Sequence, residues 1–148
     1  MYENTQSLSP TVINLETSEI RNNKLQFQLP YCEFPIHFKS LISTICVSTI
    51  CIIWKTPVGA FYGSLHSSLI EASPINPSQE LLLFAHRKSS NFTYHTPTHP
   101  AYYKIDRSNL RDSVFEISLI ALDETEKNIK TENIEKVKIQ LIVNDRFQ

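Results

Sequence analysis

Histidine spacing gives the chain its most promising sign of chemistry. His95 and His99 lie four residues apart, and His86 precedes them. Two histidines at this spacing share one face of a helix and can chelate a metal ion there. Pro97 and Pro100 make a helix very unfavourable here, and in an extended chain residues four apart are separated by about 13 Å. The sequence therefore predicts exposed loop histidines and no metal site.

Nucleophilic and phosphate-binding arrangements find equally little support. "GSLHSS" at residues 63–68 mixes Ser and His, but it is not a Gly-x-Ser-x-Gly elbow. With glycine only at Gly59 and Gly63, a glycine-rich phosphate loop cannot be built. His66 alternates with Leu65 along an apparent strand, which is typical of a surface histidine with satisfied hydrogen bonds. We therefore expect a protein that is not an enzyme, with no catalytic residue, no cofactor and no small-molecule substrate.

The charge balance argues against nucleic acid and membrane partners. The formal net charge is −1, and the first twenty residues contain Glu3, Glu16 and Glu19 without a Lys or Arg. Four neighbouring aromatic residues could stack on bases, but no basic stripe accompanies them. These are Phe92, Tyr94, Tyr102 and Tyr103. In a β-sandwich such aromatics more often fill the core or a subunit contact.

Cysteine usage indicates a reducing, intracellular compartment. Cys32, Cys46 and Cys51 form an odd set without a Cys-x-x-Cys pair, which argues against a disulfide framework and a thiolate zinc site. Cys46 and Cys51 lie in the apolar run "LISTICVSTICIIW", residues 41–54. That run is shorter than the roughly 20 residues of a spanning helix. Its Ile, Val and Thr content predicts a long buried strand, or two in tandem, with both cysteines buried as small hydrophobes.

Alternating apolar residues predict strands along most of the chain. "KLQFQLP", "SVFEISLIAL" and "EKVKIQLIVN" each place apolar side chains on one face and polar ones on the other. Further strands are expected at residues 11–17, 59–72 and 80–87, and the long strand is expected to close at residues 55–57. No amphipathic helix is apparent. Residues 1–10 are expected to be a flexible segment, and residues 11–148 one domain.

This pattern predicts an all-β fold, a single jelly-roll antiparallel β-sandwich of about eight strands. A seven-stranded immunoglobulin-like sandwich is the alternative, although Trp54 lacks the flanking cysteine pair of antibody domains.

From about Tyr62 onward, the order of strands and turns resembles a known family. "SSLIEAS" leads through a Pro/Asn loop to "ELLLF". An aromatic "PAYYKI" then precedes "SNLRDSVFEISLIALDE", and "VKIQLIV" lies close to the end of the chain. This course is similar to that of the jelly-roll capsid proteins of Polinton/Maverick-type elements and adintoviruses. A single jelly-roll unit suits their minor capsid, or penton, protein.

The resemblance implies a structural virion protein that is made inside the cell. Its partners would be further copies of itself, as a homo-pentamer, and a major capsid protein. Tyr94, Tyr102 and Tyr103 are the candidate subunit-interface residues, and loops at residues 73–79 and 86–100 would shape the contacts. The alternative is a non-enzymatic β-sandwich binding or adaptor module derived from such a capsid protein. A cupin-like enzyme would require several histidines and a carboxylate to converge inside the barrel.

Overall fold

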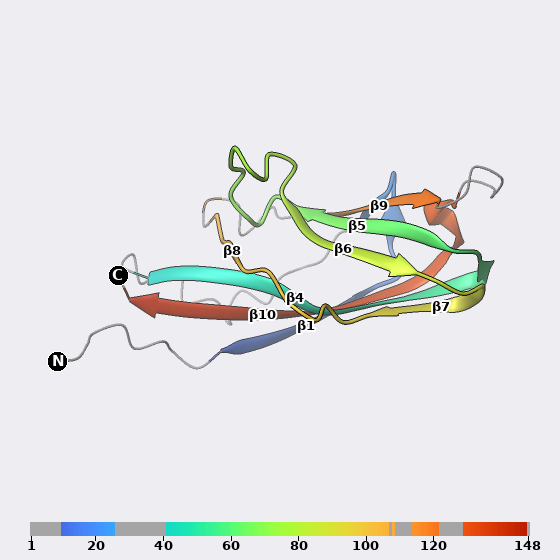
Figure 1. Ribbon diagram of the computed structural model, residues 1–148, viewed down its shortest axis with the longest axis horizontal. Coiled ribbons are helices and arrows are strands. Elements are labelled where there is room, and N and C mark those ends of the chain that lie inside the picture. The colour runs from blue at the N-terminus through green and yellow to red at the C-terminus, as the bar shows by residue number, and fades with distance from the viewer. Residues whose placement is uncertain (1–9, 26–40, 107, 109–113, 122–128, 148) are drawn as a thin grey trace.

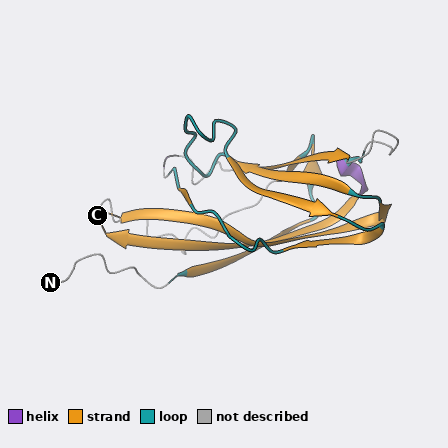
Figure 2. Ribbon diagram, in the orientation of Figure 1, coloured by secondary structure: helices purple, strands orange, loops and turns teal. Residues whose placement is uncertain are grey.

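The computed structural model describes residues 10–25, 41–106, 108, 114–121 and 129–147. The described chain forms two antiparallel β-sheets packed face to face, with one 3-10 turn, η3 (Thr131–Asn133). Figures 1 and 2 show the two layers, and they show that most of the described chain is strand. The strands are β1 (Thr11–Thr17), β2 (Ile20–Arg21), β3 (Lys24–Leu25), β4 (Leu41–Val58), β5 (Phe61–Ser67), β6 (Glu80–His86), β7 (Ser90–His95), β8 (Tyr103–Lys104), β9 (Phe115–Ala121) and β10 (Ile134–Phe147).

The first sheet, sheet A, has the order β1-β10-β4-β7, with β8 also paired to β4. Its centre is the pair formed by the two longest strands, β4 and β10, which runs from Ile134↔Trp54 to Phe147↔Leu41. β1 borders β10 on the other side, from Thr17↔Val137 to Thr11↔Val143. The register of β4 shifts between Val47 and Thr49, so Ser48 is an extra residue that bends the strand.

The second sheet, sheet B, has the order β2-β3-β9-β5-β6. β5 lies between β6 and β9 and pairs with both along its length. Gly63 faces the core on β5, where the ring of Phe84 on β6 packs directly over it. A Cβ at this position would overlap that ring, so any larger residue would force the Phe84 side chain to shift.

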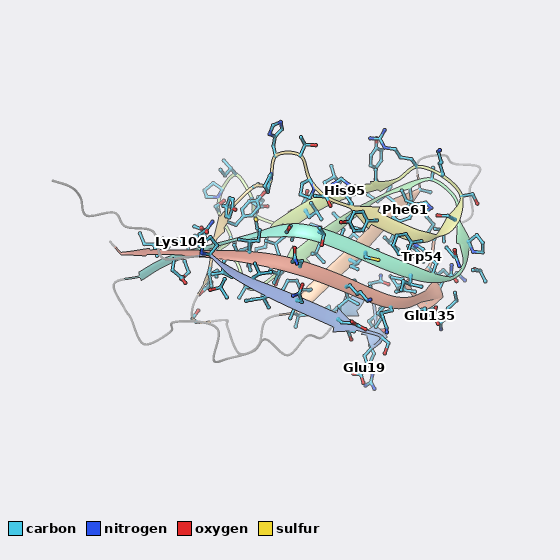
Figure 3. All side chains as sticks on the ribbon, turned by 90° about the horizontal axis from the view of Figure 1, so that it is seen from below. Glu19, Trp54, Phe61, His95, Lys104 and Glu135 are labelled. Carbon is cyan, nitrogen blue, oxygen red and sulfur yellow. The ribbon has the colours of Figure 1, made fainter. Side chains whose placement is uncertain are left out.

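The core lies between the inner faces of the two sheets and is almost entirely apolar. On β10 the buried residues alternate as predicted, namely Val137, Ile139, Leu141 and Val143. Trp54 of sheet A meets Phe61 of sheet B edge to face, with ring centroids 5.6 Å apart and planes at 84°. The two residues lie together in Figure 3. Phe61 makes a second edge-to-face contact with Phe84, at 6.1 Å.

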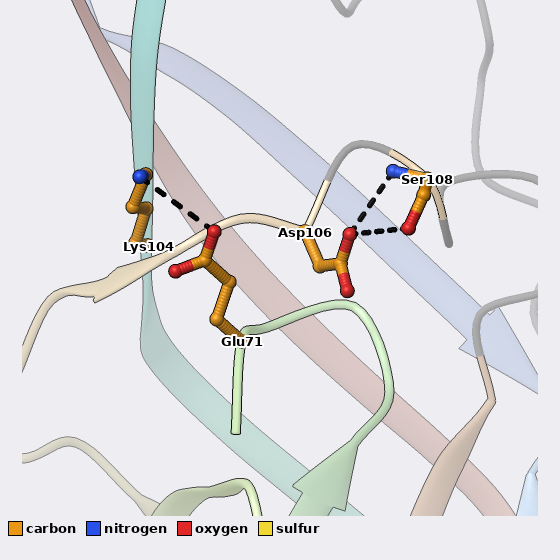
Figure 4. A network of polar contacts seen from close by, with 4 residues as sticks. All are labelled: Glu71, Lys104, Asp106 and Ser108. Atoms are coloured by element: carbon orange, nitrogen blue, oxygen red, sulfur yellow. Dashed lines mark hydrogen bonds and ion pairs between the residues drawn. The ribbon is translucent and has the colours of Figure 1, made fainter. Parts of the chain in front are cut away.

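The segment around β8 joins the two sheets at one end of the sandwich. The Ile105 N–H donates to the Ser43 carbonyl on β4 (2.9 Å), while the Asp106 N–H donates to the Leu69 carbonyl beyond β5 (2.8 Å). Figure 4 shows the side chains that support this segment. Lys104 Nζ lies 3.6 Å from Glu71 Oε1, and Asp106 Oδ1 accepts a hydrogen bond from the Ser108 N–H at 3.1 Å.

The antiparallel all-β sandwich predicted from the sequence is confirmed. β4 is one continuous strand, but it extends to Val58, so the expectation that residues 55–57 end it was wrong. The strand expected over residues 59–72 is shorter, because β5 ends at Ser67. The range 86–100, expected as a loop, contains β7. Residues 1–9 and most of "KLQFQLP" lie outside the described residues, as does Cys32.

Candidate functional site

The candidate interface tyrosines occupy different environments around sheet A. Tyr94, on β7, is 60% exposed and pairs with Cys51. Tyr102 precedes β8 and is 45% exposed. Tyr103, the next residue, is partly buried and packs against the core. Adjacent residues of an extended chain point to opposite faces, so only Tyr94 and Tyr102 remain available at the surface.

Tyr94 belongs to a group that we call the aromatic patch, on the outer face of sheet A. The patch comprises Cys51, Ile53, Phe92 and Tyr94. The two aromatic rings stack with centroids 6.5 Å apart and planes at 4°. Phe92 is 52% exposed. Large apolar side chains that are this exposed and contiguous are typical of a contact surface.

Cys51 corrects the expectation that both apolar-run cysteines are buried. Cys46 is fully buried, whereas Cys51 is only partly covered because it belongs to the aromatic patch. Partial burial raises the pKa of the Cys51 thiol, against the opposing effect of the Lys138 ammonium on the next strand. At neutral pH this thiol is therefore protonated and a poor nucleophile.

Tyr102 interacts with side chains of both central strands of sheet A. Its hydroxyl hydrogen-bonds to Cys46 on β4, which raises the pKa of Tyr102, and to Asn144 on β10, which lowers it. Cys46 pairs with Ile142, and Ile142 pairs with the half-exposed Val12 of β1. Tyr102 therefore lies at one end of a second, largely apolar row across the outer face of sheet A.

The four described histidines do not form a common site. His86 is buried between the sheets and stacked on Phe61, with ring centroids 5.2 Å apart. His66 lies on sheet B, 2.8 Å from Ser64 Oγ and 3.0 Å from the Ser78 carbonyl, so it is a satisfied surface histidine, as predicted. His95 ends β7, and His99 is an exposed residue beyond it.

His86 belongs to a buried polar network that no sequence pattern indicated. The Trp54 Nε1–H donates to Thr93 Oγ1 at 2.8 Å, and Thr93 Oγ1 lies 2.7 Å from His86 Nδ1. His86 Nε2 lies 3.1 Å from the Val58 carbonyl. Because that carbonyl can only accept, Nε2 carries the proton and Nδ1 accepts from the threonine hydroxyl. The network is fully satisfied and requires no ligand.

Two basic residues also gave no signal in the sequence, because they stand in a turn without a motif. Arg87 and Lys88 connect β6 and β7 and line a hollow of about 290 Å³ together with Ser90, Tyr94 and His95. Burial lowers the pKa of His95, and the nearby Arg87 guanidinium lowers it further. The hollow therefore presents positive charge beside the aromatic patch.

Neither a metal centre nor a membrane-spanning helix is found in the described residues. No group of three or more His, Cys, Asp or Glu side chains gathers in a metal-binding arrangement within the described ranges. In the same part of the chain, no helix has the length and apolar character needed to cross a bilayer.

Compared with known proteins, the chain matches no protein-family model, and no curated protein matches its sequence.

Proposed function

We propose that this protein is a capsid vertex subunit of the penton type, a jelly roll that associates with copies of itself and contacts a major capsid protein. It acts by assembly rather than by catalysis. Its place is the virion, after synthesis inside the cell. The candidate contact residues Tyr94 and Tyr102 lie on the outer face of sheet A, at the aromatic patch and at the apolar row beyond it.

The pairing of the strands is the observation that carries this proposal. Among the described strands, β2 pairs only with β3, and β8 pairs only with β4. When these two are set aside, eight described strands remain, including the two described residues of β3, and they pair as β1–β10, β3–β9, β4–β7 and β5–β6. The first strand thus pairs with the last, the second with the next to last, and so on inward. A jelly roll can be described as a long hairpin rolled up so that its strands pair in this order, and jelly rolls are common in viral capsid proteins. The pairing therefore supports the resemblance drawn from the sequence.

The exposed aromatics give a second line of support. Tyrosine and phenylalanine are enriched at protein interfaces, where they contribute large contact areas at a small cost in conformational entropy. Among the described residues, the two stacked rings of the aromatic patch are more than half exposed. Burial against another subunit would remove this apolar surface from water.

The mass of the protein in solution tests the proposal directly. Light scattering over a concentration series is expected to show a discrete species near five times 17.1 kDa. Metal analysis is run alongside, because a stoichiometric bound metal would instead favour an enzyme of the cupin type. A different closed ring would preserve self-association but reject the penton assignment.

Serine substitutions then locate the contact. Tyr94→Ser and Tyr102→Ser are expected to shift the mass toward monomer while the chain remains folded. Tyr103→Ser is the matched control. Because Tyr103 packs against the core, this change is expected to lower the free energy of unfolding by roughly 1–3 kcal/mol. Assembly that is unaffected by both exposed substitutions would place the contact elsewhere.

The alternative function is an adaptor module derived from such a capsid protein. Its support is an exposed apolar group on the opposite outer face of the sandwich, on sheet B. This group comprises Tyr62, Leu83 and Ile120, exposed at 48%, 59% and 66%. A monomer at every concentration, both alone and with a co-expressed major capsid protein, would favour the adaptor.

A further inference from the structure

We infer that the edge of the sandwich formed by β7 and the β6–β7 turn binds an extended acidic segment of a partner protein. This inference goes beyond the proposed function, because it requires neither a ring of subunits nor a capsid. It rests on three features that meet at this edge: a strand edge and positive charges that no described residue pairs, and exposed aromatic rings.

The first feature is the open edge of sheet A. In the described part of the chain, β7 forms ladder pairs with β4 alone. Ser90 Oγ donates to the Phe92 carbonyl at 2.9 Å and accepts the Phe92 N–H at 3.4 Å. The backbone groups of Phe92 therefore face the open edge, and those of Tyr94, two residues on, face the same way. Pairing with an added strand can start at Tyr94, where no described side chain takes this bridging position.

β7 also lacks the devices that usually protect a sheet edge. Natural edge strands are commonly blunted by charged side chains or proline. The sequence of β7 is Ser-Asn-Phe-Thr-Tyr-His, which contains neither Lys, Arg, Asp, Glu nor proline. An edge of this kind can accept a strand from another chain, in the way that several peptide-binding domains do.

The second feature is the charge of the hollow beside this edge. Arg87 and Lys88 are exposed, and neither forms an ion pair with a described residue. None of the described residues lining the hollow is an Asp or Glu. His95 lies close enough to Arg87 for the guanidinium to disfavour its protonation. Within the described ranges the two cations thus have no acidic partner, and carboxylates are their natural complement.

The third feature, the exposed rings on β7, determines which residue types should alternate along the bound segment. Phe92 and Tyr94 share the outer face of β7. On a strand added beside β7, every second side chain would lie next to these rings. The expected ligand is therefore extended, with Asp or Glu near the turn and aliphatic or aromatic residues at alternate positions. A basic segment would be repelled by the same cations.

A random library of displayed octapeptides tests this inference even while the natural partner is unidentified. Selection on the intact protein is expected to enrich peptides rich in Asp or Glu with alternating apolar residues. In labelled protein, the best of them is expected to protect the Tyr94 amide from hydrogen exchange. The double reversal Arg87→Glu/Lys88→Glu should weaken these peptides at least tenfold and should itself select Lys- or Arg-rich peptides.

A matched variant and a second anion complete the test. Arg21→Glu/Lys130→Glu reverses two exposed cations that do not line the hollow, and the preference for acidic peptides should persist. The inference is overturned if no peptide is selected, or if the selected composition is unchanged by the reversal at the hollow. It is also overturned if a single-stranded oligonucleotide of equal charge binds as tightly as the peptides, which would indicate a general anion surface. Light scattering reports self-association separately, so failure here leaves the proposed function standing.

Discussion

Thr93 is the residue on which the buried polar network depends. Its hydroxyl accepts from Trp54 Nε1–H and donates to His86 Nδ1, so a single oxygen satisfies two other buried groups. The other ring nitrogen of His86, Nε2, carries the proton and donates it to the Val58 carbonyl at the end of β4. One hydroxyl therefore links the edge strands of both sheets, β7 and β6, to the core.

Thr93→Val is expected to lower the free energy of unfolding by roughly 2–5 kcal/mol, because it leaves a buried donor and a buried acceptor without partners. Thr93→Ser retains the hydroxyl and should cost only about 1 kcal/mol for the lost methyl group. Urea unfolding followed by fluorescence of Trp54, the single tryptophan, measures both. Equal losses in the two variants would show that the hydroxyl contributes little.

Gly63→Ala is expected to destabilise the protein by about 1–3 kcal/mol, as is typical of overpacking. The new methyl group would overlap the ring of Phe84, and this outweighs the roughly 0.5–1 kcal/mol that alanine gains over glycine in a strand. In a Phe84→Leu background the same change should cost at least about 1 kcal/mol less. Additive effects in that double-mutant cycle would contradict the steric explanation.

At the scale of elements, β8 shows how a very short strand can close one end of a sandwich. Its ion pair with Glu71 is about half exposed, and such pairs contribute little to stability. Ile105 follows β8 and forms a backbone bridge with Ile70. Its buried side chain contributes more to stability than the ion pair does. Removal of that side chain should therefore loosen this end of the molecule.

Ile105→Ala is expected to lower the free energy of unfolding by roughly 2–5 kcal/mol. Glu71→Gln should change it by less than about 1 kcal/mol. Chemical denaturation of the two variants beside the wild type gives the comparison. A larger loss from Glu71→Gln than from Ile105→Ala would mean that the ion pair, rather than the apolar contact, holds this segment.

His95, at the end of β7, is expected to make the stability of the protein depend on pH. Burial and Arg87 lower the pKa of His95 in the folded chain, so between that value and about 6.5 the unfolded chain binds more protons. Stability should therefore fall as the pH drops below about 6.5. An NMR titration should place the pKa of His95 below 6.5, and His95→Gln should flatten this part of the stability profile. A pKa above 6.5 would contradict the prediction.

The sequence predicted those elements whose two faces differ in polarity. Alternation on β9 and β10 placed Phe115, Ile117 and Val137 in the core, because one face of each strand is buried and the other is not. The same rule fails for Cys51, since it lies in a mostly apolar run whose outer face is only partly covered. Pairing partners such as β1 and β10 could not be read from local pattern, because sequence neighbours do not specify them.

The surface of the candidate site was predictable only in part. Alternation could have separated Tyr102 from Tyr103, because neighbours in an extended segment point to opposite faces. The location of Tyr94 beside Cys51 required the pairing of β7 with β4, which is a tertiary fact. Arg87 and Lys88 carried no signal of their own, and their importance comes from the open edge beside them.

At the scale of the whole molecule, the fold is dominated by contacts between residues distant in sequence. β1 pairs with β10, and β3 pairs with β9. Closing such long loops is entropically costly before the contacts form, so folds of this kind fold slowly. We expect refolding in milliseconds to seconds, measured by stopped-flow fluorescence of Trp54. Complete refolding within microseconds would contradict this view of the topology.

The central position of β10 has a consequence for synthesis on the ribosome. β10 is the last described strand along the chain, yet it lies between β1 and β4. Chains are made at about 5–20 residues per second and tend to begin folding from the N-terminal side. Here β1 and β4 emerge long before the strand that separates them. Until β10 is made, the edge of each strand that will pair with it stays unpaired. Nascent chains of this protein should therefore depend on holding chaperones until residue 147 has left the exit tunnel.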